Sequence, residues 1–283
     1  MDAVLLQRLS QITEEERELL QGRGVDRALY ASGRAFEVDA AKMLEKGKLM
    51  SIRPHTRFAP FPRHSHNYVE IMYMCRGKTV HRIDGDALVT LEAGELLFLN
   101  RHASHAIQRA DAGDIAVNFI VLPQFFDEAF NMAGMDNVLS RFLLGELYTG
   151  GAAVSYLHFR VREVLPVQNL VENMVWTLVN RQPGARRINQ VTMGLLLLQL
   201  MHYTECIDMS RNGSVRSPMV EAALREIEEN YRAASLTDVA AAFHVGLPYL
   251  SAEVKRATGS TFKELLLHKR LDKAARLLRE TRL

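Results

Sequence analysis

Apolar positions divide the chain into regions of different period. From Ala3 to Gln21, leucine and isoleucine recur at helical spacing between acidic residues, which predicts one amphipathic helix. From about Tyr30 to Leu122, short apolar stretches alternate with turn pairs, of which Asp84-Gly85 and Ala93-Gly94 are the clearest. Several short strands at this spacing predict a small β-barrel or sandwich.

Helical periodicity takes over after the barrel. Residues 168–182 carry an apolar i, i+4 stripe, Pro183-Gly184 ends this helix, and a second, broadly apolar helix follows. These helices either pack on the β domain or form the interface of a homodimer, and the sequence leaves both open. The expected α+β chain comprises a helical arm appended at residues 1–27, a β-barrel over 28–123, a helical dimerisation or linker region over 124–212, and an all-α domain over 213–283.

Composition narrows the class of protein. The 283 residues are 48% hydrophobic and 24% charged, enough for two compact domains, and the formal charge is only +2, so any DNA-binding surface must be local. Cys75 and Cys206 alone can form neither a disulfide framework nor a cysteine metal site. The N-terminus lacks the uninterrupted apolar core of a signal peptide, and the apolar runs are too short to span a bilayer. We therefore expect a cytoplasmic protein without a membrane partner.

The last region predicts a helix-turn-helix. A supporting helix begins at Ser217-Pro218, a second begins at the N-cap Ser235, and a glycine-containing turn at residues 244–246 leads to a third helix that starts near Pro248. In such a unit the second helix of the pair lies in the major groove of DNA. The residues left on the outer face of this helix are Pro248, Tyr249, Ser251, Ala252, Lys255 and Arg256.

Local charge agrees with a nucleic-acid partner. From Val254 to Leu283 there are nine basic and three acidic residues, and nine minus three leaves six positive charges. Such a stripe suits the phosphate backbone, which supplies most non-specific affinity. The alternative is a solvated face on a purely structural helical bundle.

The stretch SLTDVAAAFHVGLPYLSAEVKRATGSTFKELLLHKRLDKAARLLRET, which begins at Ser235, resembles the first helix-turn-helix and connecting helix of AraC-type (AraC/XylS) regulators. The resemblance rests on YLS, a lysine four positions later, TG, F and RL..A..LL. It implies a DNA-binding domain with two such motifs, and this sequence ends at Leu283, where the second motif would begin. We therefore expect the second motif to be absent and operator binding by this sequence to be weak.

The reading helix departs from the family at Ala252, where arginine is common and a methyl group can contact only thymine. By position, Pro248, Ser251 and Ala252 are expected at the base edges, and Lys255 and Arg256 near phosphates. The resemblance also implies a cupin-like sensor domain in front of the DNA-binding domain.

Histidines in the β region carry a second pattern. His64, His66 and Glu70, followed by Gly77, resemble the first motif of a cupin barrel, and His105 lies where the second motif ends. His64 and His66 share one strand face by the period of two, Glu70 follows four residues on, and His105 arrives from a neighbouring strand. Three imidazoles and one carboxylate could bind Zn, Mn, Fe or Ni, or could line a pocket for an effector without a metal.

Three positions of the second cupin motif differ from the family pattern: Asn100, His102 and Arg109. The leading hypothesis is a regulator, not an enzyme, that senses a small molecule such as a sugar or another metabolite in the barrel. The alternative is a metal-dependent cupin enzyme, an oxygenase, isomerase or hydrolase that uses the same four residues, with a structural helical C-terminus.

Overall fold

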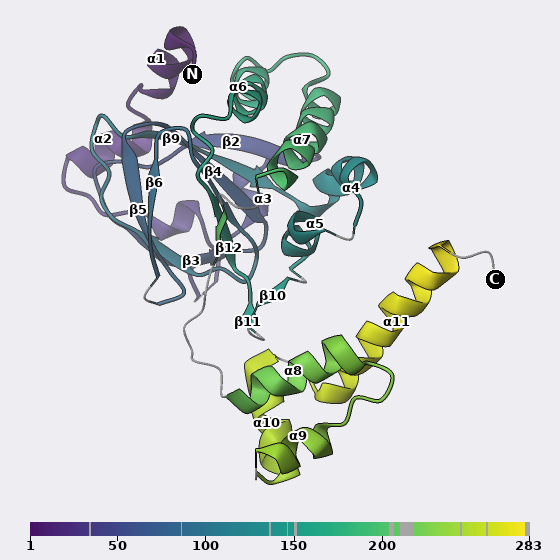
Figure 1. Cartoon of the computed structure of the whole chain (residues 1–283). Helices are drawn as coiled ribbons and strands as arrows, with labels where there is room; N and C mark the ends of the chain where they lie inside the picture. Colours follow the sequence, from purple (N-terminus) through teal and green to yellow (C-terminus); the bar gives the residue numbers. More distant parts are fainter. Residues whose placement is uncertain are drawn as a thin grey trace. The chain divides into compact units, whose positions relative to one another are not determined.

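The chain folds into two compact units, which are described separately (Figure 1). Unit 1 comprises Met1–Leu147 and Val154–Ser210, and unit 2 comprises Tyr148–Ala153 and Arg211–Leu283. Among the described residues, no helix has the length and apolar character needed to cross a membrane. The computed structural model describes residues 1–33, 35–85, 87–135, 137–145, 147–149, 152–203, 207–209, 218–243, 245–258 and 260–280.

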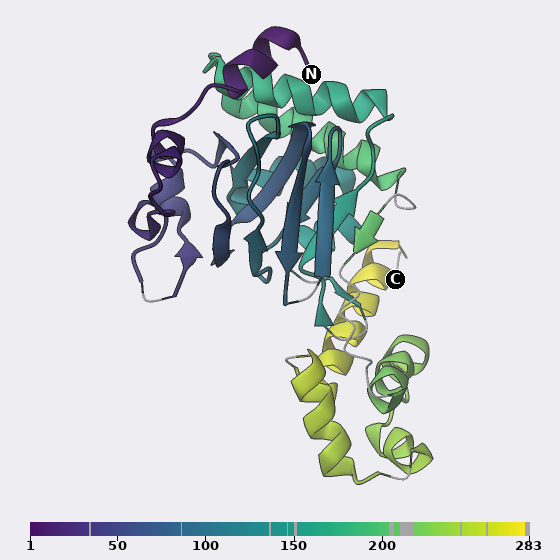
Figure 2. The ribbon, with the colours of Figure 1, turned by 90° about the vertical axis from the view of Figure 1, so that its left-hand side faces the viewer.

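Unit 1 is built on two β-sheets whose side chains form a common core between them, and its strands are seen along their length in Figure 2. The five-stranded sheet has the order β1 (Glu37–Val38), β3 (Phe61–His66), β8 (His105–Ile107), β5 (Lys78–Ile83) and β6 (Ala87–Glu92). The six-stranded sheet has the order β13 (Ile207–Met209), β12 (Tyr156–Phe159), β7 (Leu96–Leu99), β4 (Val69–Arg76), β9 (Ile115–Val121) and β2 (Met50–Pro54).

The predicted barrel is confirmed. Met72 and Leu97 of the six-stranded sheet share the inner core with Ile83 and Leu91 of the five-stranded sheet. The expected hairpin at Asp84-Gly85 joins β5 to β6, and both residues have positive φ, 48° and 104°, as a tight two-residue turn requires.

Helices cover the other face of the six-stranded sheet, and Val69, Ile71 and Tyr73 of β4 pack into that second core. Because β4 is buried on both faces, its sequence is a continuous apolar run without alternation. The covering elements, seen beside the sheet in Figure 1, are η2 (Pro123–Phe126), α4 (Asp127–Ala133), α5 (Val138–Leu143), α6 (Leu165–Val179) and α7 (Ala185–Met201).

The two helices predicted after the barrel are confirmed as α6 and α7, but the expectation of helices alone over residues 124–212 is wrong. β12 pairs with β7 of the barrel, and β13 pairs with β12. All four side chains of β12 are buried, so this segment shows neither alternation nor the length of a helix. A short hairpin, β10 (Tyr148–Thr149) with β11 (Ala152–Ala153), also lies in this stretch.

The N-terminal segment is two helices rather than one, α1 (Ala3–Leu9) and α2 (Glu14–Leu20). Thr13 and Glu16 form a capping box that starts the second helix. The segment is also not a mere appendage, because Leu5 is completely buried in the core under the sheet. Two short helices, η1 (Arg27–Leu29) and α3 (Ala40–Met43), follow.

Unit 2 contains the predicted helical domain. Val220, Val239, Leu250 and Phe262, one from each helix, share its core. The expected cap Ser235 accepts a hydrogen bond from the Asp238 amide, while His244, Gly259 and the expected linker at residues 211–214 lie outside the described residues. The helices are α8 (Pro218–Asn230), α9 (Leu236–Ala242), α10 (Leu247–Thr258) and α11 (Phe262–Glu280).

Candidate functional site

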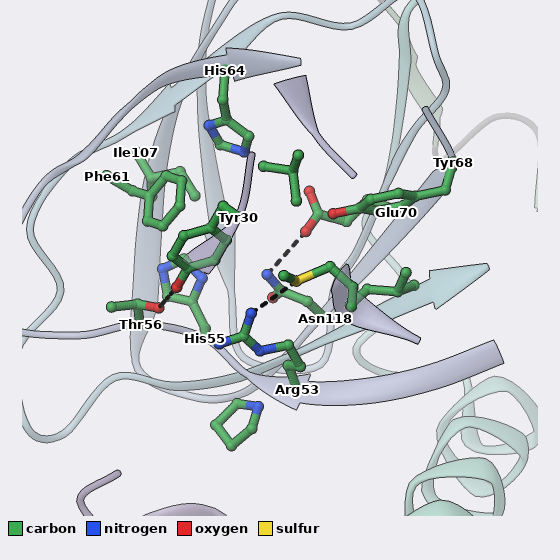
Figure 3. A pocket seen from close by; sticks show the side chains of 14 residues that line it. Tyr30, Arg53, His55, Thr56, Phe61, His64, Tyr68, Glu70, Ile107 and Asn118 are labelled. Atoms are coloured by element: carbon green, nitrogen blue, oxygen red, sulfur yellow. Dashed lines mark hydrogen bonds between the residues drawn. The ribbon is translucent and has the colours of Figure 1, made fainter. Parts of the chain in front are cut away.

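The predicted histidine cluster comes together inside the barrel (Figure 3). His64 on β3 is the register partner of His105 on β8, and their rings lie 4.2 Å apart between centroids. His66 follows on β3, and both His66 and His105 are at most 1% exposed. Glu70 differs from expectation: β3 ends at His66, so Glu70 reaches the cluster from β4 of the facing sheet.

Backbone carbonyls fix the tautomers of two of these histidines. The Nδ1 atom of His64 lies 2.9 Å from the carbonyl oxygen of Pro62, and the Nδ1 atom of His66 lies 2.8 Å from that of Tyr68. A carbonyl oxygen can only accept, so each Nδ1 carries the proton and donates it. The Nε2 atoms of His64 and His66 are therefore bare acceptors in the neutral rings.

The carboxylate of Glu70 faces these nitrogens without a hydrogen bond to them. Its Oε2 atom lies 3.4 Å from Nε2 of His105 and 4.0 Å from Nε2 of His66. Within the described residues, all three atoms are buried and have no hydrogen-bond partner. The other oxygen, Oε1, accepts a hydrogen bond of 3.0 Å from the Asn118 amide, which fixes the orientation of the carboxylate.

Burial sets the charge of the cluster. It lowers the pKa of His64 to about 3 and the pKa of His55 to about 4, so these rings are neutral near pH 7. Burial would raise the pKa of Glu70, but the imidazoles of His105 and His66 outweigh it and hold that pKa well below its ordinary value. The cluster is thus an ionised carboxylate among neutral imidazoles, and its net charge is negative.

This donor set fits a divalent metal ion. One nitrogen each from His64 and His105 and one oxygen from Glu70 lie within 4.8 Å of one another. Ligand atoms about 2.1 Å from a common ion are roughly 3.0 to 3.5 Å apart, so small side-chain adjustments would suffice. Such an ion would satisfy acceptors that are otherwise orphaned inside the barrel.

Two further histidines belong to the same wall and were missed by sequence reasoning. His81 on β5 is fully buried and stacks 6.0 Å from His105 between ring centroids, and His55 after β2 lies 6.2 Å from His81. Nε2 of His55 and Nδ1 of His81 have no hydrogen-bond partner among the described residues. The alternation of Thr79, His81 and Ile83 along β5 was the available signal for His81.

A small cavity adjoins the cluster, and the side chains of Figure 3 line it. Tyr30 and Arg53 lie at one side of it, while His64, Glu70 and Asn118 lie at the other. Its volume is about 40 Å³, which corresponds to room for about three water molecules.

Asn100, one of the departures from the cupin pattern, is a structural residue. Its side-chain amide donates hydrogen bonds to the carbonyl oxygens of Phe142 and Val154, at 3.1 and 2.8 Å, and its oxygen accepts from the amide of His102. The side chain therefore anchors the loop after β7 and takes no part in the histidine cluster.

In unit 2, α10 separates its buried and exposed faces as expected. Leu250 and Val254 are completely buried, whereas Tyr249 is 53% exposed. Pro248, Ala252 and Lys255 are also exposed, Ser251 is half-buried, and the side chain of Arg256 lies outside the described part.

The basic stripe is smaller than the sequence suggested. Lys269 on α11 pairs with Glu228, and the guanidinium of Arg270 donates to the carbonyl oxygens of Tyr231 and Arg232 at 2.8 and 3.0 Å. These two cations hold α11 against the end of α8 and are not free for phosphate.

Residues 51–130 match the family model of the AraC-like ligand binding domain, and this range holds the whole histidine cluster. The chain is also 26% identical over 236 residues to the HTH-type transcriptional activator RhaS of Enterobacter sp. (strain 638), which covers 82% of this chain and 79% of that protein. The protein of the same name from Shigella sonnei is 25% identical over the same shares. The chain belongs to the AraC family of transcription regulators.

Solved structures give more distant likenesses to this AraC-family chain. Apo ToxT from Vibrio cholerae aligns with a TM-score of 0.44 and 13% identity, covering 83% of this chain and 84% of that one. The AraC-like transcriptional activator CuxR aligns with a TM-score of 0.33 and 13% identity, covering 74% and 67%.

Membership of the AraC family decides between the two functions considered from the sequence. The chain is a ligand-responsive transcription regulator and not an enzyme, so the alternative of a metal-dependent cupin enzyme is set aside. Regulators of this family bind DNA and small-molecule effectors.

Proposed function

We propose that this AraC-family regulator binds its effector inside the barrel, among His64, His66, Glu70 and His105, and binds DNA through the exposed face of α10. The observation that carries the effector site is the buried carboxylate of Glu70, which faces imidazole nitrogens and is left without a hydrogen bond to them. Unpaired buried acceptors are costly, so a bound group that satisfies them is stabilised there.

DNA contact involves two kinds of side chain on α10. Pro248, Ser251 and Ala252 face base edges, and Tyr249 flanks them on the same exposed face. Lys255 and Arg256 contact phosphates and set the affinity that is independent of sequence. The small side chain of Ala252 favours contact with a thymine methyl group over reading by hydrogen bonds.

The regulator acts as a homodimer through α6 and α7. Trp176, Ile188, Val191 and Leu195 are between 38% and 43% exposed, although the opposite face of α7 is buried in the core. These apolar side chains line a surface groove along both helices. A second copy of the same helix pair is self-complementary to this stripe, as a two-fold interface requires.

The test selects DNA duplexes from a random pool with the intact chain and measures their affinity by fluorescence anisotropy at several salt concentrations. Ala252→Glu places a negative charge on the exposed face of α10 and is expected to weaken binding at least about tenfold. Leu88→Glu, at a 59%-exposed position on β6, is the matched control and should bind as the wild type does. Failure to enrich any duplex, or equal binding by both variants, would contradict the proposal.

A further inference from the structure

We infer that the effector is a divalent first-row transition-metal ion, bound by the Nε2 atoms of His64, His66 and His105 and by the carboxylate of Glu70. This inference rests on the proposed function and names the ligand of its barrel site. Imidazole and carboxylate ligands together suit Zn, Ni, Fe and Mn.

The first argument is the direction of the lone pairs. Because His64 and His66 donate their Nδ1 protons to backbone carbonyls, their Nε2 atoms present lone pairs. That of His66 meets Oε2 of Glu70, itself an acceptor, at 4.0 Å. Opposed acceptors in a buried site repel each other unless a cation lies between them. Histidines that bind metals commonly have their second nitrogen fixed by a carbonyl oxygen in this way.

A second acid–imidazole pair in unit 1 shows the contrasting arrangement. His158 and Glu95 are both buried, and Nε2 of His158 lies 2.9 Å from Oε2 of Glu95 in a direct hydrogen bond. That pair is satisfied without an ion. The fold thus accommodates a directly bonded carboxylate and imidazole, and the separation at Glu70 is a feature of that cluster alone among these two pairs.

The third argument is size. A cavity of about 40 Å³ accommodates an ion with a few waters. Pockets that bury organic ligands of drug size are roughly 300 to 1,000 Å³. A monosaccharide would need the barrel to open, whereas an ion requires only side-chain adjustment.

Such an ion would also join the two sheets. His64, His66 and His105 lie on the five-stranded sheet, and Glu70 lies on β4 of the six-stranded sheet. The neighbours of Glu70, Val69 and Ile71, pack in the core shared with α6 and α7. Occupancy of the site therefore stabilises one spacing of β4 against the opposite wall, and this is the differential binding that a response requires.

The test uses the intact chain after treatment with a chelator. Zn²⁺, Ni²⁺ and Co²⁺ are added separately, bound metal is measured by equilibrium dialysis with elemental analysis, and the visible spectrum of the Co²⁺ form reports nitrogen and oxygen ligation. We expect one ion per chain. Glu70→Gln should lower the affinity at least about 100-fold, the upper end of what loss of an outer-shell partner costs. The matched control Glu95→Gln should retain the wild-type affinity.

The response is measured with a selected DNA duplex in the same samples. Metal loading of the wild type should change DNA affinity at least about fivefold, the lower end of typical coupling. No stoichiometric binding of any of the three ions, or binding with unchanged DNA affinity, would overturn the inference. If a sugar or another organic metabolite changed DNA affinity while the ions did not, the inference would fail and the proposed function would stand. Absence of DNA binding under every condition would instead overturn the proposed function.

Discussion

Oε2 of Glu70 lies 3.4 Å from Nε2 of His105, and neither atom has a hydrogen-bond partner among the described residues. The two groups are buried in the same cavity wall and come from opposite sheets. An arrangement of this kind is costly without a ligand and favourable with one.

Glu70→Gln is therefore expected to change the stability of the chain in opposite directions with and without metal. In chelator the variant should be more stable than the wild type by about 1 kcal/mol, because an amide can donate to the bare nitrogens. With saturating Zn²⁺ the wild type should be the more stable form, since only it gains binding energy. Urea denaturation in both buffers measures this. A variant less stable by the same amount in both buffers would show that Glu70 has only a structural role.

The pair of Glu16 and Arg57 ties α2 to the barrel. Arg57 donates hydrogen bonds of 2.7 and 2.9 Å to the two oxygens of Glu16, and the side chains are 4% and 1% exposed. Glu16→Gln leaves the guanidinium buried without its counter-charge and should lower the free energy of unfolding by about 3 to 5 kcal/mol at pH 7. Glu14→Gln, which breaks an exposed pair with Arg17, should cost less than about 1 kcal/mol.

The cost of Glu16→Gln should depend on pH. Burial raises the pKa of Glu16, but hydrogen bonds from Arg57 and the Thr13 backbone outweigh it and hold the pKa below its ordinary value of 4.5. A lowered folded-state pKa adds stability that is present above the unfolded-state pKa and is lost as the pH falls through the folded-state pKa. The difference between wild type and variant should therefore shrink below pH 4.5. A constant difference from pH 7 to pH 3 would contradict this account of the pair.

Gly94 and Gly47 form a matched test of backbone packing in the barrel. Both have positive φ, 86° and 83°, but a Cβ at Gly94 would lie 2.8 Å from Cβ of Arg162, whereas nothing lies within 4 Å at Gly47. Alanine at either position costs about 1 to 2 kcal/mol for the left-handed backbone. Gly94→Ala should cost about 1 to 3 kcal/mol more, because Arg162 must move. Equal urea midpoints for the two variants would show that this turn is free to relax.

Among the basic residues of unit 2, Lys255 and Lys269 should differ in their effect on DNA affinity. Lys255 is exposed on α10, while Lys269 pairs with Glu228. Lys255→Ala should weaken binding similarly for all sequences and reduce the slope of log affinity against log salt by about 1. Lys269→Ala should leave that slope unchanged. The same slope change in both variants would mean that α10 is not the surface that meets phosphate.

The proposed dimer can be tested at the exposed stripe of α7. Leu195 is 43% exposed there, and Leu88, at 59% on β6, is an exposed leucine on another element. Leu195→Glu should convert the dimer to a monomer in size-exclusion chromatography with light scattering, and Leu88→Glu should not. A dimer that tolerates Leu195→Glu would move the interface to another face.

Much of this fold could be predicted where the sequence has a clear period. The helices of unit 2 followed from caps such as Ser235 and Thr261, and His64 and His66 followed from the period of two in a strand. Glu70 was assigned to the cluster from its spacing but to the wrong strand, because buried strands on both sides of a short turn give one continuous apolar pattern. β12 was missed for the same reason.

Other features depend on contacts distant in sequence. Glu16 and Arg57 are 41 positions apart, and each residue alone resembles an ordinary surface charge. His55 and His81 belong to no motif, and only the closure of the barrel brings them beside His105. Single-sequence patterns identify faces of elements, whereas such pairs depend on how the faces meet.

The most direct test of the account is the affinity of the intact chain for a selected duplex, measured by anisotropy for the wild type and Glu70→Gln with and without saturating Co²⁺. The account predicts a change of at least about fivefold on metal addition for the wild type and no change for Glu70→Gln. An identical response of the two proteins, or no response of the wild type, would contradict control of DNA binding through Glu70 and its histidines.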